Sequence, residues 1–201
     1  DEMEILKNYK SVASCEVTPQ HLFFSSPECY ERLGSLAQMN PPIRDVNHKK
    51  GLWNGIKKKI VDVIGSDHAP HTLDEKSKNY PNCPSGMTGV QTLLPIMLNF
   101  VNQKKLSLFD VVRLTSTNPC EIYRIKNKGL IIEGYDADLT IIDLKKEFKI
   151  TNSWIASKCK WTPYDQMKIK GLPVSTIVNG NLVMKESQIL SKPIGRSVSF
   201  I

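Results

Sequence analysis

Histidine is scarce in this sequence of 201 residues: it has four, and no two of them are separated by a single residue. The sequence therefore contains no H-x-H pair of metal ligands. Its five cysteines form no C-x-x-C pair, and their number is odd and their spacing wide. This pattern argues against a zinc knuckle and predicts reduced thiols in a cytoplasmic protein.

Long apolar runs are also lacking. No stretch approaches the ~20 residues that a membrane helix needs. The N-terminal DEMEILKNYK is polar and acidic, which is not typical of a signal peptide. It lacks an initiator Met and reads as the end of an amphipathic helix. We therefore expect no membrane association, and we expect the chain to begin inside a larger protein.

The net charge of +7 comes from lysines scattered along the chain without interleaved aromatic residues. This arrangement predicts a solvated surface and no nucleic-acid groove, and it mildly favours an anionic substrate. The hydrophobic fraction of 40% and the charged fraction of 23% are ordinary for a globular protein. A packed core is therefore expected.

Apolar runs at 11–17 and 59–66 predict two buried strands, and helical patterns follow each of them. This alternation over 1–128 is typical of a parallel α/β unit. Residues 129–201 change to β-type patterns, and Asn179-Gly180 between two apolar runs predicts a hairpin. We therefore predict two parts, an α/β part over 1–128 and a small β module over 129–201.

Capping residues predict where several helices begin. Ser26, which precedes a proline, is expected to cap one helix, and either Asp45 or Asn47 a second. Ser107 with Asp110 three residues later has the spacing of a capping box.

The stretch GSDHAPHT, residues 65–72, follows the second predicted strand. Asp67 comes directly after the Gly-Ser exit, and His71 follows Pro70. Parallel barrel strands carry their reactive side chains at their C-terminal ends. A carboxylate there can bind a metal and carry a proton, and a histidine can donate to a substrate carboxylate. A turn or helix-cap role for Asp67 is the alternative, but the cluster and its position favour function.

Several stretches resemble dihydroorotase, of the amidohydrolase superfamily. They are GSDHAPHT, KSKNYPNCPSGMTGVQT, CEVTPQHLFFS with MNPPIR, KGLIIEGYDADLTIIDL and TPYDQMKIKGLPVSTIVNGNLV. The resemblance covers about 12–183, and D-H-A-P-H together with N-P-P-I-R is specific for dihydroorotase within the superfamily. It implies the C-terminal portion of a (β/α)8 TIM-type barrel over 1–128 and a small β-sandwich module over 129–201.

The resemblance also implies roles for individual residues. Asp67 matches an aspartate that ends the eighth barrel strand, ligates one zinc ion and acts as general base and then acid. His71 matches a histidine that hydrogen-bonds the substrate's carboxylate. Asn40 matches a residue that contacts the dihydropyrimidine ring or its carboxylate, and Ser85 and Gly86 match a backbone stretch that lines the ring.

Other polar side chains are expected to support the fold or the site. His21 resembles a family position usually preceded by another histidine, where Gln20 stands here. Cys83 has no base beside it, so a nucleophile is not expected. The remaining candidates are expected to brace, pack or face solvent: Arg44, His48, His68, Trp53, Trp154 and Trp161.

The resemblance implies a binuclear zinc centre, most of whose ligands are absent from this sequence. The H-x-H-x-R strand is missing, as are the bridging carboxylate or carboxylated lysine and two further histidines. One aspartate cannot hold a catalytic zinc ion, which needs about three protein ligands. We therefore expect the chain to be inactive without an N-terminal part of the same enzyme. A homodimer or aspartate transcarbamoylase are further possible partners.

The sequence leaves two classes of function open. The first is a dihydroorotase that reversibly hydrolyses (S)-dihydroorotate to N-carbamoyl-L-aspartate in pyrimidine biosynthesis. The second is a non-catalytic homologue that serves as a scaffold for aspartate transcarbamoylase. A hydantoinase or allantoinase is a closer rival, acting on a ring without the carboxylate. The presence of Asp67, His71 and Asn40 favours the dihydroorotase.

Overall fold

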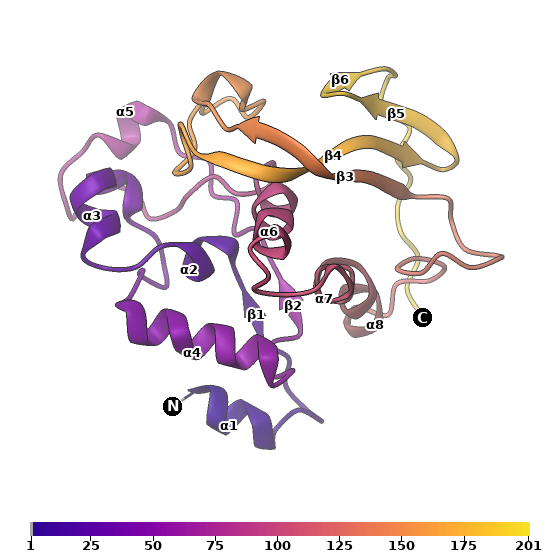
Figure 1. Ribbon diagram of the computed structural model, residues 1–201, viewed down its shortest axis with the longest axis horizontal. Helices are drawn as coiled ribbons and strands as arrows, with labels where there is room; N and C mark the ends of the chain where they lie inside the picture. The colour runs from indigo at the N-terminus through magenta and orange to yellow at the C-terminus, as the bar shows by residue number, and fades with distance from the viewer. Residues whose placement is uncertain (1) are drawn as a thin grey trace. The chain divides into compact units, whose positions relative to one another are not determined.

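The computed structural model describes residues 2–201 and has a mixed α/β fold, as predicted (Figure 1). The chain forms two compact units. The described part of the first unit comprises residues 2–93 and Lys149–Lys168, and the second unit comprises Leu94–Phe148 and Ile169–Ile201. This division reflects which residues pack together and does not test the two predicted parts. The boundary near residue 128 therefore stays a prediction.

Two short parallel strands lie at the centre of the first unit. β1 (Glu16–Val17) pairs with β2 (Val63–Ile64) in parallel, with Val17 opposite Ile64. Between the two strands the chain forms α2 (Pro19–Phe23), α3 (Glu28–Leu33), the 3-10 turn η1 (Gly34–Ala37) and α4 (Val46–Lys57). Both strands are shorter than predicted. A strand is assigned only where its backbone pairs with a neighbour, and each has one partner strand among the described residues.

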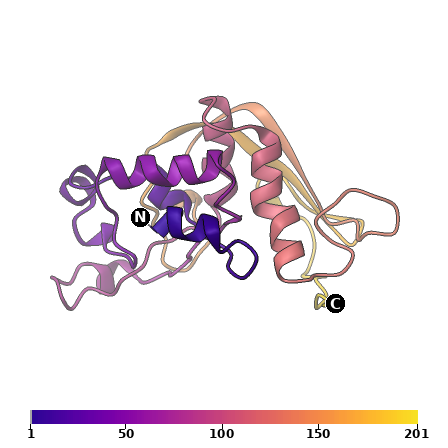
Figure 2. The same ribbon diagram turned by 90° about the horizontal axis from the view of Figure 1, so that it is seen from below.

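The remaining elements of the first unit surround these strands. α1 (Glu2–Asn8) lies against α4 (Figure 2). The Met3 side chain lies next to Gly55 in this contact. The rest of this unit contains α5 (Leu73–Lys76) and the 3-10 turn η3 (Asn152–Trp154). Its core includes Trp161 and Tyr164, both 1% exposed. The Tyr164 ring stacks on Phe24 with ring centroids 5.1 Å apart. The returning segment 149–168 therefore helps to fill the core of the unit that contains β1 and β2.

Two of the three predicted caps are confirmed. The Asp45 carboxylate accepts from the backbone N–H groups of the next turn and caps α4. Ser107 and Asp110 form the predicted capping box. The prediction for Ser26 is wrong, because α3 begins at Glu28 without a side-chain cap. The backbone N–H of Ser26 instead donates to the carbonyl of Arg44.

The second unit contains one antiparallel sheet and four helical segments. The helical segments are α6 (Leu93–Asn102), α7 (Leu108–Val112), the π-helix η2 (Arg113–Thr117) and α8 (Asn118–Ile122). The strands are β3 (Leu139–Lys149), β4 (Lys168–Val178), β5 (Asn181–Lys185) and β6 (Gln188–Ile189), in the order β3-β4-β5-β6. Asn179 and Gly180 join β4 to β5 with φ angles of 48° and 76°, which confirms the predicted hairpin.

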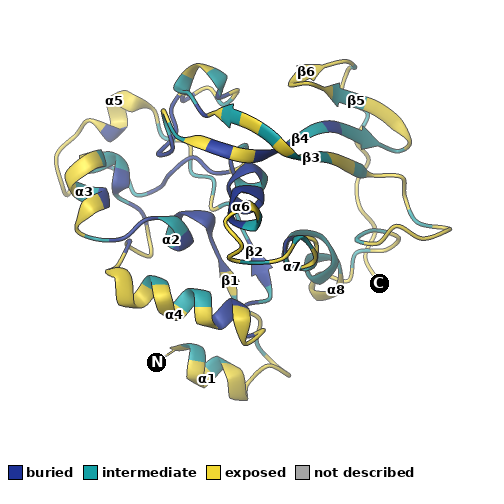
Figure 3. Cartoon of the chain, in the orientation of Figure 1, coloured by how far each residue is buried: buried dark blue, intermediate teal, exposed yellow. Residues whose placement is uncertain are grey.

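Helix α6 packs against β4 in the second unit. Most of its residues are buried, as Figure 3 shows. A Cβ at Gly171 of β4 would lie 2.8 Å from the Leu98 Cβ, so only glycine permits this close approach. Asn102 at the end of α6 donates from its amide to the carbonyls of Leu144 and Lys170, which fixes the helix to the sheet. No helix among residues 2–201 is long and apolar enough to span a membrane.

Candidate active site

Asp67 lies where the chain turns sharply out of β2. It has a φ angle of 43°, in the left-handed region that aspartate tolerates better than most residues. Its exposed side chain lines a cavity of about 860 Å³ together with Thr18, His21 and Asn40. Among the described residues, no hydrogen bond or ion pair holds the Asp67 carboxylate. This carboxylate is therefore available to a ligand in the cavity.

The residues that follow Asp67 are held firmly by the loop 85–92. The Ala69 N–H donates to the Met87 carbonyl at 2.9 Å. The Gly89 N–H donates to His68 Nδ1 at 3.1 Å, so the neutral His68 ring carries its proton on Nε2. This contact agrees with the supporting role predicted for His68. The Val90 N–H lies 3.5 Å from the same His68 nitrogen, so hydrogen bonds from one loop fix the turn at Asp67 on its C-terminal side.

Gln20 and Trp161 fix the same stretch from other sides. The buried Gln20 amide donates to the carbonyl of Ser66, the residue before Asp67, at 3.0 Å. The Trp161 indole N–H donates to the carbonyl of His71 at 2.8 Å, and the Trp161 carbonyl accepts from the Thr88 hydroxyl at 2.9 Å. Trp161 was predicted to be a packing residue, and it also anchors the backbone of the candidate site.

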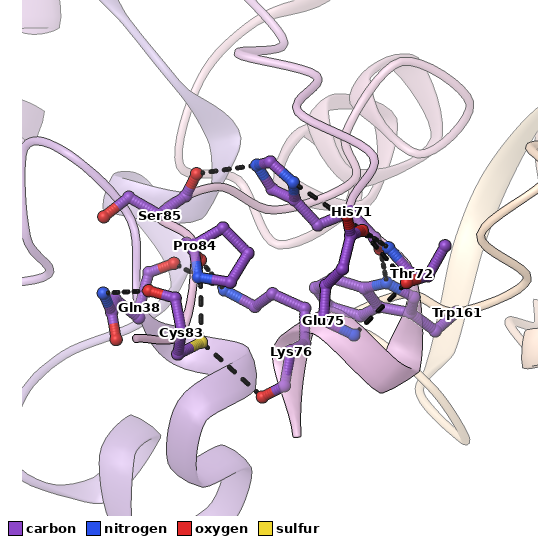
Figure 4. A network of polar contacts seen from close by, with 9 residues as sticks. All are labelled: Gln38, His71, Thr72, Glu75, Lys76, Cys83, Pro84, Ser85 and Trp161. Atoms are coloured by element: carbon purple, nitrogen blue, oxygen red, sulfur yellow. Dashed lines mark hydrogen bonds and ion pairs between the residues drawn. The ribbon is translucent and has the colours of Figure 1, made fainter. Parts of the chain in front are cut away.

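The residues predicted to bind substrate lie side by side. His71 Nε2 donates to the Ser85 carbonyl at 3.1 Å, and the Asn40 amide donates to the Ser85 hydroxyl at 3.2 Å (Figure 4 shows the first pair). The Gly86 N–H donates to the Gln38 carbonyl at 2.9 Å. Asn40 also lines the cavity that Asp67 lines. Asn40 therefore connects the group around Ser85 to the wall that carries Asp67.

His71 is engaged on both sides in this arrangement. Its Nε2 faces Ser85, and its Nδ1 lies 4.0 Å from the Glu75 carboxylate. A ligand that binds Nε2 would therefore have to replace the Ser85 carbonyl. The side chain is 33% exposed, so a small anion can reach the ring.

The side chains that were assigned supporting roles make mainly structural contacts. His21 Nδ1 lies 2.8 Å from the Thr18 hydroxyl, and its Nε2 lies 2.9 Å from the Pro41 carbonyl, so both ring nitrogens already have protein partners. His48 is exposed and pairs with Asp45 at 3.4 Å. The buried Cys83 thiol contacts backbone carbonyls. Arg44 lines the cavity, and its carbonyl braces residue 26.

Comparison of the sequence with known proteins identifies the family of this chain. The sequence profile of the amidohydrolase family matches residues 24–183. The chain belongs to the amidohydrolase family. It is 40% identical over 195 residues to a dihydroorotase from Pyrococcus horikoshii, covering 97% of this chain and 45% of that protein. It is 41% identical over 176 residues to a dihydroorotase from Methanosphaera stadtmanae, covering 88% of this chain and 40% of that protein.

Solved amidohydrolase-type structures confirm the predicted fold class. The L-hydantoinase (dihydropyrimidinase) from Arthrobacter aurescens superposes with a TM-score of 0.88 at 32% identity, covering 94% of this chain and 44% of that one. The dihydropyrimidinase from Brevibacillus agri superposes with a TM-score of 0.86 at 22% identity, which supports the fold alone. This amidohydrolase chain thus spans less than half the length of these relatives, and its two parallel strands form part of a barrel.

Amidohydrolases are generally metal-dependent, but the described residues do not form a metal site by themselves. Within residues 2–201, no group of three or more His, Cys, Asp or Glu side chains is placed to hold a metal ion. Asp67 alone would supply one of the roughly three protein ligands that a catalytic zinc ion needs. The donor set that residues 2–201 bring together is therefore insufficient for a catalytic zinc centre.

Two residues of this amidohydrolase site were not predicted from the sequence. Lys76 is fully buried and Gln38 is half-buried, and both contact the loop that carries Ser85. A lysine in a sequence with many scattered lysines gives no signal of burial. Gln38 lies two residues before Asn40, and this proximity was the one available signal for it.

Gly86→Ala tests how closely the two loops of the site approach each other. A Cβ at Gly86 would lie 2.4 Å from the Ala69 Cβ, and the Gly86 φ angle is 137°. We expect the free energy of unfolding to fall by about 1–3 kcal/mol, because overpacking forces the loops apart. Urea denaturation measures this loss. Gly34→Ala is the control, since Gly34 also has a positive φ but a Cβ there meets nothing within 4 Å. An equal loss in both variants would show that backbone strain, and not close approach, matters at Gly86.

Proposed function

We propose that this chain is the C-terminal part of a dihydroorotase, which reversibly hydrolyses (S)-dihydroorotate to N-carbamoyl-L-aspartate in pyrimidine biosynthesis. One observation carries the proposal: the free Asp67 carboxylate lines a cavity with Asn40, and Asn40 is bonded to the group formed by Ser85 and His71. The identity of about 40% to proteins named dihydroorotase supports it. The other half of the site would come from an N-terminal part of the same enzyme, without which we expect the chain to be inactive.

Each residue has a role that its surroundings suit. Water attacks the ring amide carbon, the new C–O bond forms and the ring C–N bond breaks. Asp67 takes the proton of the attacking water and delivers it to the departing nitrogen. A carboxylate without a hydrogen-bond partner is suited to accept and release a proton. Asn40 hydrogen-bonds the ring amide through its own side-chain amide.

The substrate carboxylate distinguishes this reaction from that of a hydantoinase. His71 binds the carboxylate through Nε2 after leaving the Ser85 carbonyl. The Ser85 and Gly86 backbone, held against Gln38, lines one edge of the ring. The net charge of +7 favours the approach of an anionic substrate.

A binuclear zinc centre belongs to the proposal as well. Of the residues in this chain, Asp67 is the one proposed as a ligand, and the other ligands would lie outside the chain. A cytoplasmic location, and partnership with a second copy or with aspartate transcarbamoylase, stay predictions. The non-catalytic scaffold is the second candidate, and a hydantoinase or allantoinase the third. The free carboxylate of Asp67 favours the enzyme, because a scaffold would have no use for it.

The substrate profile of the full-length protein, loaded with zinc, tests the proposal. We expect kcat/KM for dihydroorotate to exceed that for hydantoin by at least about 100-fold, because a site built for a carboxylate discriminates strongly against a ring without one. His71→Asn should raise the KM for dihydroorotate by about tenfold or more, through loss of a hydrogen bond to a charged group. Lys78→Asn is the control, since Lys78 is exposed and does not line the cavity that Asp67 lines.

Each alternative predicts a different profile. Preference for hydantoin, with no effect of His71→Asn, would identify a hydantoinase-type enzyme. Hydrolysis of neither ring by the zinc-loaded protein would favour the scaffold.

A further inference from the structure

A fully buried lysine lies beneath the candidate substrate loops. Lys76 ends helix α5, and its side chain has 0% exposure. Its ammonium group donates to the carbonyls of Gln38 and Pro84, each at 2.9 Å (Figure 4). The Cys83 thiol lies beside it. Burial lowers the pKa of Lys76, and the neighbouring Cys83 acts in the opposite direction. A buried charge of this kind is costly unless it is well hydrogen-bonded.

The two carbonyls belong to the loops that carry the candidate substrate contacts. Gln38 lies two residues before Asn40, and Pro84 immediately precedes Ser85. The Gln38 carbonyl accepts from both Lys76 and the Gly86 N–H. The Gln38 amide in turn donates to the Cys83 carbonyl at 2.7 Å. The Lys76 ammonium group thus links the loop of Gln38 to the loop of Pro84. It does so at the Gln38 carbonyl, which also accepts from the Gly86 N–H.

Helix α5 connects this ammonium group to a third candidate contact. Thr72, which directly follows His71, caps the helix in a capping box with Glu75. The Glu75 carboxylate also lies 4.0 Å from His71 Nδ1. The position of His71 is therefore set by the same four-residue helix that ends in Lys76.

We propose that Lys76 is a positioning residue that holds the Asn40 loop and the Ser85–Gly86 loop at the spacing that the substrate ring requires. This inference rests on the proposed function for the identity of the ring. Stability alone does not account for a lysine here, because apolar residues of similar volume often replace buried charges without loss of stability. The two hydrogen bonds of the charged group are directional, and they fix two backbone segments relative to each other. An apolar side chain of the same size would not do this.

Lys76→Met in the full-length protein tests this role. Methionine fills the space without the ammonium group. We expect the KM for dihydroorotate to rise about 10–100-fold, since small displacements of positioning groups have effects of this size. We expect kcat to change by less than about threefold, because Lys76 does not contact the reacting atoms. Lys78→Met is the matched control, since Lys78 is exposed two residues away. It should leave both constants unchanged.

Amide hydrogen exchange without substrate separates this inference from the proposed function. We expect exchange in 83–89, which contains the Gly86 N–H, to quicken about tenfold in Lys76→Met while exchange in the rest of the protein is unchanged. Unchanged exchange in 83–89, or faster exchange throughout the protein, would overturn the inference whatever the substrate is. A wild-type protein that fails to hydrolyse dihydroorotate would overturn the proposed function and leave the exchange result standing.

A second variant covers the case in which Lys76→Met does not fold. Lys76→Gln keeps N–H donors at a shorter reach and should give intermediate values of both KM and exchange. If neither variant folds, Lys76 serves the fold itself, and a positioning role is refuted.

Discussion

Asp67→Asn in the full-length enzyme is expected to lower kcat for dihydroorotate by about 10²–10⁴-fold, the contribution usually made by a positioned acid or base. Asparagine matches the shape of aspartate but neither accepts the proton of the attacking water nor delivers one to the ring nitrogen. The measurement is steady-state turnover in both directions, because the proposed mechanism assigns the same carboxylate to hydrolysis and to ring closure. Asp74→Asn is the control, since Asp74 is exposed on α5 and outside the cavity wall.

The local structure indicates that Asp67→Asn removes chemistry and leaves the fold intact. The carboxylate holds no other described residue, and asparagine tolerates the φ angle of 43° as well as aspartate does. The unfolding midpoint should therefore equal that of the wild type. Turnover within about tenfold of the wild type would contradict the proposed proton transfer, since loss of the group that carries the proton costs more than this.

The sequence pointed to the location of this chemistry for a physical reason. An apolar run followed by Gly-Ser and then Asp67 predicts a carboxylate at the C-terminal end of a buried strand, and Asp67 lies just beyond β2. The pairing of Asn40 with Ser85 has a different origin. Their separation of 45 residues carries no local signal, so their proximity followed only from the resemblance to dihydroorotase.

Sequence patterns predicted the structure correctly where residues within one turn of each other determine it. The Asp45 cap, the capping box of Ser107 and the Asn179-Gly180 turn depend on neighbouring residues alone. Ser26 failed because α3 begins one residue later than expected, with Pro27 at the N-cap position. The Ser26 N–H bonds to Arg44, 18 residues along the chain, and no local pattern encodes that contact. Lys76 could not be recognised for the same reason, since its partners Gln38 and Pro84 lie on two separate loops.

Trp161→Ala should have the largest effect on stability. The side chain is 1% exposed, and loss of a buried aromatic ring costs about 3–5 kcal/mol of the free energy of unfolding. Trp161→Phe keeps a buried aromatic ring but removes the hydrogen bond to the His71 carbonyl and some of the ring volume, so it should cost less, about 2 kcal/mol. Urea denaturation measures both losses. A smaller loss in the Phe variant than in the Ala variant would show that the aromatic ring supplies most of the stabilisation.

The Phe variant also tests whether the anchor serves the substrate. Without the indole N–H, the His71 backbone loses a bond of 2.8 Å, so the KM for dihydroorotate should rise about three- to tenfold while kcat is maintained. Trp154→Phe is the matched control, because Trp154 lies in the same segment but is only partly buried. If Trp161→Phe lowers stability and leaves the KM unchanged, Trp161 acts on the core alone, and the position of His71 is set by Thr72, Glu75 and Ser85 without it.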